Sequence, residues 1–250
     1  MTPLDQTQSP SRTGSGQFHT THWSLVRAAG RRSSPGAREA LSALCQTYWY
    51  PLYAYIRGKG YGSDDAQDLT QAFFAWLLEK NIAQKADRER GKFRSFLLAS
   101  LNHFIAKEWR RAGAQKRGGG QVVLSLDLAA GERRFGMEPA DELTAERIFE
   151  RRWALALLEA TLARLRDEFA ARQKLEIFEH LKPHLGSDPS AVPYRQIAQE
   201  LGKTEGAIKV AVHRLRERCR ELLRAEIAQT VSSPEEVDEE LHDLFNAIGP

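Results

Sequence analysis

Apolar residues recur every three or four positions along most of this chain, which is the spacing of a helix that buries one face. In the segment 63–79 the pattern consists of Ala66, Leu69, Phe73, Trp76 and Leu77. The segment 93–111 repeats it with Phe93, Phe96, Leu97, Leu101, Phe104 and Ile105. Strand-like composition is confined to one short run, residues 122–124. The periodicity therefore predicts an all-α protein.

Changes in composition divide the helical segments into two small domains joined by a linker. Residues 1–21 are polar and predict a disordered leader, and residues 22–112 form a first helical domain. Glycines and charges in 113–152 indicate the linker. Residues 153–228 form the second domain, and residues 229–250 are an acidic tail.

Local signals set expectations for individual helices. Pro51 should kink a helix over 37–56 or split it in two, and Ser63 is a good N-cap for the helix that follows. Helical patterning over 141–180 predicts one long segment. A short amphipathic helix is expected in the tail, with its apolar face formed by Val237, Leu241, Leu244 and Phe245.

The charge of the chain is unevenly distributed. Lys and Arg number 36 and Asp and Glu number 33, giving a net charge of +3. No Lys or Arg follows Arg224, whereas seven acidic residues do, so residues 1–224 carry 36 basic and 26 acidic groups, a net of +10. A basic body favours a polyanionic partner such as nucleic acid. The tail could fold back on this body or recruit a partner, and the sequence leaves both open.

Several classes of protein are excluded by composition. The chain has no run of about 18 consecutive apolar residues, so we expect no membrane span. Residues 1–17 lack the apolar core of a secretory signal. Cys45 and Cys219 are far apart and form no disulfide framework, which favours the reducing cytoplasm. Without a phosphate loop, nucleophile elbow or set of metal ligands, we expect no enzyme activity, no cofactor and no metal.

The most specific pattern lies between Tyr194 and Arg218. A first short helix would face inward with Ile197, Ala198 and Leu201, and Gly202 would then close a turn. A second helix would begin after the cap residue Thr204, with its inward face formed by Ile208, Val212 and Leu215. This arrangement predicts a helix-turn-helix, whose second helix enters the major groove of DNA.

The outward face of the second helix is basic. From Gly202 to Arg224 there are seven basic residues and three acidic ones. The side chains left to face a groove or water include Glu205, Lys209, Val210, His213, Arg214 and Arg216. The simpler interpretation is a helical hairpin with a solvated basic face, but the cap, glycine, spacing and charge together favour DNA binding.

The segment Tyr194–Arg218 resembles the C-terminal region of bacterial RNA polymerase sigma factors of the extracytoplasmic-function type. Asp68–Phe74 resembles the helix by which that family holds the polymerase clamp. Phe93–Leu97, continuing to Trp109–Arg111, resembles the next helix, which binds and opens the downstream (minus-ten) promoter element. The chain departs from the family at Val210–Ala211, where many members have Ser-Arg, and in lacking the Pro-Pro turn before the helix-turn-helix.

The resemblance implies a sigma factor, with core RNA polymerase and promoter DNA as partners. An anti-sigma protein could be a third partner. The upstream (minus-thirty-five) element would contact Thr204, Glu205, Lys209, His213, Arg214 and Arg216. The downstream element would contact Arg94, Asn102, Lys107, Trp109, Arg110 and Arg111. The polymerase clamp would meet Asp68 and Gln71. Trp109 has a structural alternative, since a tryptophan at a helix end commonly packs against the core or its rim.

Two other functions fit parts of the sequence. A stand-alone DNA-binding regulator, such as a dimeric repressor, would use the helix-turn-helix without polymerase. A nuclease or recombinase would need convergent carboxylates, for which Asp65 and Asp68 are candidates, and a divalent metal.

Overall fold

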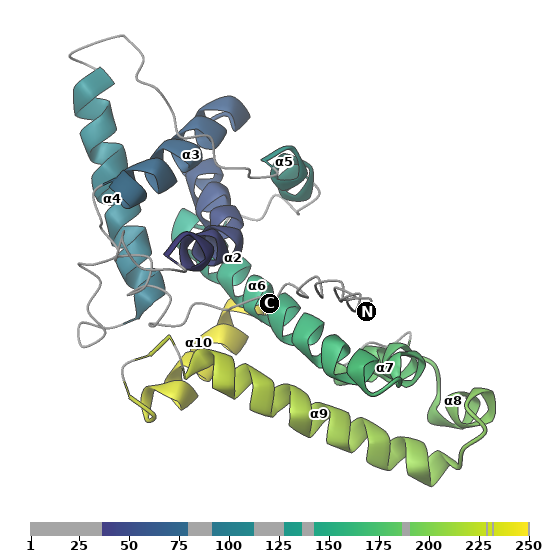
Figure 1. Ribbon diagram of the computed structural model, residues 1–250. Helices are drawn as coiled ribbons and strands as arrows, with labels where there is room; N and C mark the ends of the chain where they lie inside the picture. Colours follow the sequence, from purple (N-terminus) through teal and green to yellow (C-terminus); the bar gives the residue numbers. More distant parts are fainter. Residues whose placement is uncertain are drawn as a thin grey trace, which may run out of the picture.

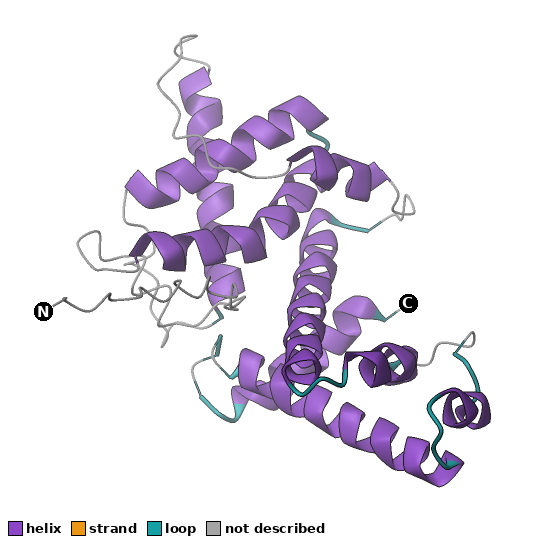
Figure 2. Ribbon diagram, turned by 45° about the vertical axis from the view of Figure 1, so that its right-hand side comes forward, coloured by secondary structure: helices purple, strands orange, loops and turns teal. Residues whose placement is uncertain are grey.

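The computed structural model describes residues 37–79, 92–112, 128–136, 143–186, 191–228, 230–231 and 233–249 (Figures 1 and 2). Its helices are α2 (Ala37–Gly58), α3 (Ser63–Glu79), α4 (Phe93–Ala112), α5 (Leu128–Gly136), α6 (Ala145–Ala171), α7 (Leu175–Leu181), η3 (Lys182–Leu185), α8 (Tyr194–Glu200), α9 (Glu205–Ile227) and α10 (Glu236–Ile248). These ranges contain helices and no strand, which confirms the all-α prediction. The leader, 1–21, and the strand-like run, 122–124, lie outside them. None of the described helices combines the length and apolar character needed to cross a bilayer.

Helices α2, α3 and α4 pack together with the first half of α6, around a core rich in aromatic side chains (Figure 1). Phe73 of α3 and Phe104 of α4 meet edge to face, with ring centroids 5.7 Å apart. Phe149 of α6 meets Tyr55 of α2 in the same way, at 6.3 Å. Such aromatic pairs add to the stabilisation that burial alone supplies. This body holds α4 and α3, which carry two of the predicted sites.

The structure corrects two local predictions in this body. Pro51 does not split α2, which is one continuous helix, because the residues around the proline, including Leu52 and Tyr53, are fully buried and their packing outweighs the cost of a lost hydrogen bond. The alternative, a kink at Pro51, stays a prediction. Ser63 is the first residue of α3 and not its cap. The carbonyl of Gly62 accepts the first hydrogen bond of this helix, from Ala66 at 2.9 Å.

A second buried cluster joins the far half of α6 to α7, α8 and most of α9. Helices α6 and α9 contribute to both clusters: Phe149 and Ile227 belong to the first, and Leu165 and Val212 to the second. The two long helices lie against each other and connect the two clusters. The proposed division at 113–152 remains a prediction, although the first turns of α6, at 145–152, pack on the first body.

The long helix predicted over 141–180 is interrupted. Helix α6 ends at Ala171, and the chain turns through Gln173, whose φ is +57°, before α7 begins at Leu175. The amides of Gln173 and Lys174 donate to the carbonyls of Ala170 and Phe169, both at 2.9 Å. These are the hydrogen bonds of a Schellman motif. The end of α6 could not be predicted from the sequence, because Gln173 occupies the position where a glycine usually marks such a turn.

The acidic tail contains helix α10, which packs against α6 and α9. Val237 and Leu244 are buried and Leu241 is half-buried, as expected for an amphipathic helix. Phe245, however, is 59% exposed and does not belong to the buried face. The tail therefore folds back on the body of the protein, one of the two possibilities that the sequence left open.

Candidate nucleic-acid interface

Helices α8 and α9 are joined by a tight turn over residues 201–204. Gly202 has a φ of +61°, a conformation that glycine adopts without steric cost. The amide of Gly202 donates to the carbonyl of Gln199 at 3.3 Å, and that of Lys203 donates to Ala198 at 2.8 Å. This second Schellman motif ends α8 and directs the chain into α9.

Thr204 caps the start of α9, as predicted. Its hydroxyl accepts a hydrogen bond from the amide of Ala207 at 3.2 Å, and its own backbone is extended. The inward faces also match the sequence pattern: Ile208 and Val212 of α9 and Ile197 of α8 are buried in one cluster. The packing of this cluster leaves the other face of α9 free to meet a ligand.

The outward face of α9 exposes most of the predicted residues. Lys209, His213 and Arg216 are spaced so that they share one side of the helix, and Arg214 is exposed beside them. Lys209 pairs with Glu205 at 2.7 Å, and this hydrogen bond lowers the pKa of Glu205. The neighbouring Val210 is 50% exposed, so an apolar surface lies among the charges.

Arg216 and Arg218 have structural partners that the sequence did not reveal. The Nε of Arg216 donates to the carbonyl oxygen of His184 at 2.8 Å, which ties α9 to η3. Arg218 holds both carboxylate oxygens of Glu168 on α6, at 2.9 and 2.7 Å, and lowers the pKa of that carboxyl. Part of the basic character of α9 therefore serves the contact between helices.

A second exposed surface follows α4. Asn102 is exposed, although its side-chain oxygen accepts a hydrogen bond from the Tyr55 hydroxyl at 2.9 Å. Trp109 is 66% exposed, and its Nε1 donates to the hydroxyl of Tyr61 at 2.5 Å. Trp109 is therefore not part of the core, whereas the other structural alternative, packing at the rim, is compatible with its contact with Tyr61.

Basic residues flank this tryptophan. Arg110 is exposed, with its Nε donating to the carbonyl of Ala106 at 3.1 Å, and Lys107 is half-buried. Lys107, Trp109 and Arg110 all lie on the last turns of α4. Arg111 belongs to the same helix, but its side chain lies outside the described part of the structure.

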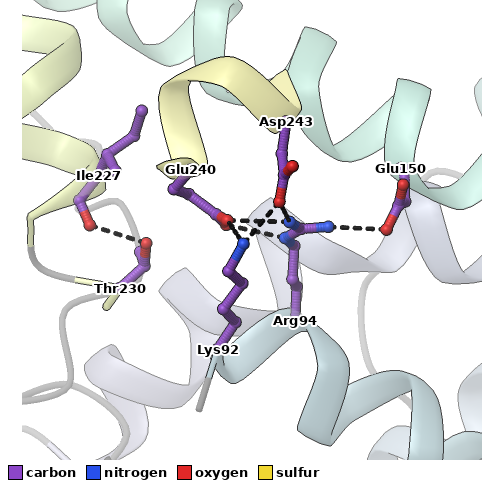
Figure 3. A network of polar contacts seen from close by, with 7 residues as sticks. All are labelled: Lys92, Arg94, Glu150, Ile227, Thr230, Glu240 and Asp243. Carbon is purple, nitrogen blue, oxygen red and sulfur yellow. Dashed lines mark hydrogen bonds and ion pairs between the residues drawn. The ribbon is translucent and has the colours of Figure 1, made fainter. Parts of the chain in front are cut away.

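Arg94, at the other end of α4, is separated from this surface and is only 6% exposed. Figure 3 shows its guanidinium enclosed by carboxylates from two helices. Glu240 of α10 accepts from Nε and one terminal nitrogen at 2.8 and 2.9 Å, and Glu150 of α6 accepts from the other at 2.8 Å. The side chain also lies over the ring of Trp153, 4.4 Å from its centroid. In this arrangement the guanidinium of Arg94 is covered by its partners, and its predicted contact with DNA stays a prediction.

The predicted polymerase contacts lie on α3. Asp68 is exposed and Gln71 is half-buried, and their spacing of three places them on one side of the helix. Phe73 of the same helix is fully buried and Leu69 is half-buried against the core, so the apolar side holds α3 in place.

Among the described residues, no group of three His, Cys, Asp or Glu could hold a metal ion. Burial raises the pKa of the Cys45 thiol to about 12 and also raises that of Cys219. Both thiols are therefore poor nucleophiles at neutral pH.

Comparison with known proteins adds no further identification. The sequence matches no protein-family model, and no similar curated protein or solved structure was found.

Proposed function

We propose that the chain is a sigma factor that binds core RNA polymerase and directs it to promoters. The observation that carries the proposal is the exposed basic face of α9, which follows a capped start and a tight turn after α8. A helix held in this way can enter a major groove, where Lys209 and Arg214 would contact phosphates or guanine edges. This pair of helices would form the predicted helix-turn-helix.

The surface on α4 supports a second contact with DNA. Exposed Trp109 offers a ring on which an unpaired base can stack, and the basic residues Lys107 and Arg110 lie on the same turns of α4. Figure 1 places α8 and the start of α9 at the end of the molecule farthest from α4, and Figure 2 agrees. Two separated DNA-binding surfaces suit a protein that contacts two promoter elements, whereas a repressor needs only the first.

Binding to core RNA polymerase tests the proposal. Full-length protein with Asp68→Ala should bind core about tenfold more weakly, as expected when a charge at an interface is removed. Asp65→Ala is the matched control, because Asp65 is also exposed on α3 but lies outside the proposed contact. Fluorescence titration of core with labelled protein measures both affinities.

Equal affinities of the two variants would refute the assignment of Asp68. Tight binding to a duplex without any binding to core would favour the stand-alone regulator. Divalent-dependent cleavage of DNA that is lost in both variants would favour the nuclease.

A further inference from the structure

Helix α10 binds the positively charged start of α4 with two carboxylates. Glu240 is 1% exposed and contacts Arg94 with both oxygens, and Asp243 lies 3.1 Å from the same guanidinium. Lys92, which immediately precedes α4, contacts Glu240 at 2.5 Å and Asp243 at 2.6 Å. The two cations and two carboxylates form one compact network between segments about 150 positions apart in the sequence (Figure 3).

The geometry of this network is that of anion recognition. A guanidinium that presents two nitrogens to two oxygens binds a carboxylate or a phosphate in the same manner. Burial lowers the pKa of Lys92, but its hydrogen bonds to Asp243 and Glu240 outweigh that effect and the pKa is raised overall. The hydrogen bond from Lys92 lowers the pKa of Asp243. The contact between Lys92 and Asp243 thus favours the charged form of each, and both cations of the network are paired with carboxylates of the chain itself.

Arg94 lies on the helix that carries the proposed DNA surface, and Lys92 immediately precedes that helix. Trp109 and Arg110 occupy the last turns of α4 and remain exposed, while Arg94 occupies its first turn and is covered. If α10 moved away, Lys92 and Arg94 would become exposed, and the positive surface of α4 would then reach from its last turns to its start. The rest of α10 is held by Val237 and Leu244, which are buried against the body, and by an ion pair between Asp238 and Arg224 at 2.6 Å.

We propose that α10 is an autoinhibitory helix whose Glu240 and Asp243 occupy the site on Lys92 and Arg94 that promoter phosphates take when α10 leaves. This inference rests on the proposed function, since it assigns promoter DNA as the competitor. The closed state limits binding of free protein to DNA. Core polymerase and promoter together supply the anionic contacts that displace α10.

The test removes the two charges from α10 in the full-length protein. Glu240→Gln with Asp243→Asn keeps the size of both side chains and weakens their hold on the cations. Glu235→Gln with Glu239→Gln is the matched control, because it removes the same charge from exposed positions at the start of α10. The probe is single-stranded DNA of the minus-ten region bound in the presence of core polymerase, measured by anisotropy between 50 and 200 mM salt.

The first variant should bind this DNA more tightly than the wild type, and the control should not. The wild type must break the ion pairs between α10 and the two cations before it binds DNA, and salt weakens such pairs. The advantage of the variant should therefore shrink as the salt concentration rises from 50 to 200 mM. If the variant and the control have the same affinity and the same dependence of log K on log salt, the proposal is overturned. The contacts of α10 would then serve only to stabilise the fold.

Hydrogen exchange on the wild-type protein provides a measurement that needs no variant. The amides of α10 should be protected in the free protein and should lose protection in the complex with core and promoter DNA. Continued protection in that complex would overturn the proposal. If the protein binds neither core nor DNA, the proposed function fails and the proposal fails with it. If both bind while α10 stays protected, only the autoinhibitory role fails.

Discussion

Substitution of Gly202 by alanine tests the turn that places α9. The φ of +61° at this position costs a residue with a Cβ about 1–2 kcal/mol. No atom lies within 4 Å of the added Cβ, so the penalty comes from the backbone alone. Alanine also restricts the unfolded chain, which offsets about 0.4–1 kcal/mol. We expect Gly202→Ala to lower the free energy of unfolding by about 1 kcal/mol.

Gln173 supplies the matched control, because it has nearly the same φ, +57°, in the other Schellman motif. Gln173→Gly should raise the free energy of unfolding by about 1 kcal/mol, the reverse of the effect at Gly202. Urea unfolding followed by far-ultraviolet circular dichroism measures both, with an unchanged slope expected. A neutral or stabilising Gly202→Ala would refute the turn geometry described for α8 and α9.

Three further substitutions test the interface and the contact between helices. Lys209→Ala should weaken promoter binding and, if Lys209 contacts a phosphate, reduce the salt slope by about one; an unchanged affinity and slope would remove it from the interface. Trp109→Ala should cost about 1–3 kcal/mol of single-strand binding in anisotropy titrations and leave stability within about 0.5 kcal/mol, since the side chain is exposed. Glu168 has a pKa below its ordinary 4.5 because Arg218 binds its charged form, so the pair stabilises the fold fully above about pH 4.5 and less as the pH falls through the lowered pKa. Glu168→Gln should lower stability at pH 7 and flatten this acid dependence in urea titrations, and an unaltered pH profile would contradict the role of the pair.

Much of the local structure could be predicted from the sequence, because it depends on neighbouring residues. Apolar spacing predicted α3 and α4 to within a residue or two, and Thr204 and Gly202 predicted the cap and the turn of α9. The split expected at Pro51 is absent because the hydrogen bond that a proline removes is a local loss, whereas the packing that keeps α2 continuous comes from helices distant in the sequence. Gln173 misled because the turn after α6 has no glycine to mark it.

The candidate site was less predictable where it depends on distant pairings. Arg94 belongs to a basic helix and looks accessible in the sequence, but its partner Glu240 lies 146 positions away. The same holds for Arg216, whose hydrogen bond to the carbonyl of His184 involves a backbone group with no signal in the sequence. The contrast between an acidic tail and a basic body was the available sign of the contact with α10, and it did not specify the residues.

The most direct test of the proposed function is transcription by core RNA polymerase with and without this protein, from a library of promoter fragments. Sequencing of the 5′ ends of the transcripts identifies every start site. We predict a new set of start sites that requires the protein and that shares two sequence elements upstream. A set of start sites that is the same with and without the protein would contradict the proposal that it is a sigma factor.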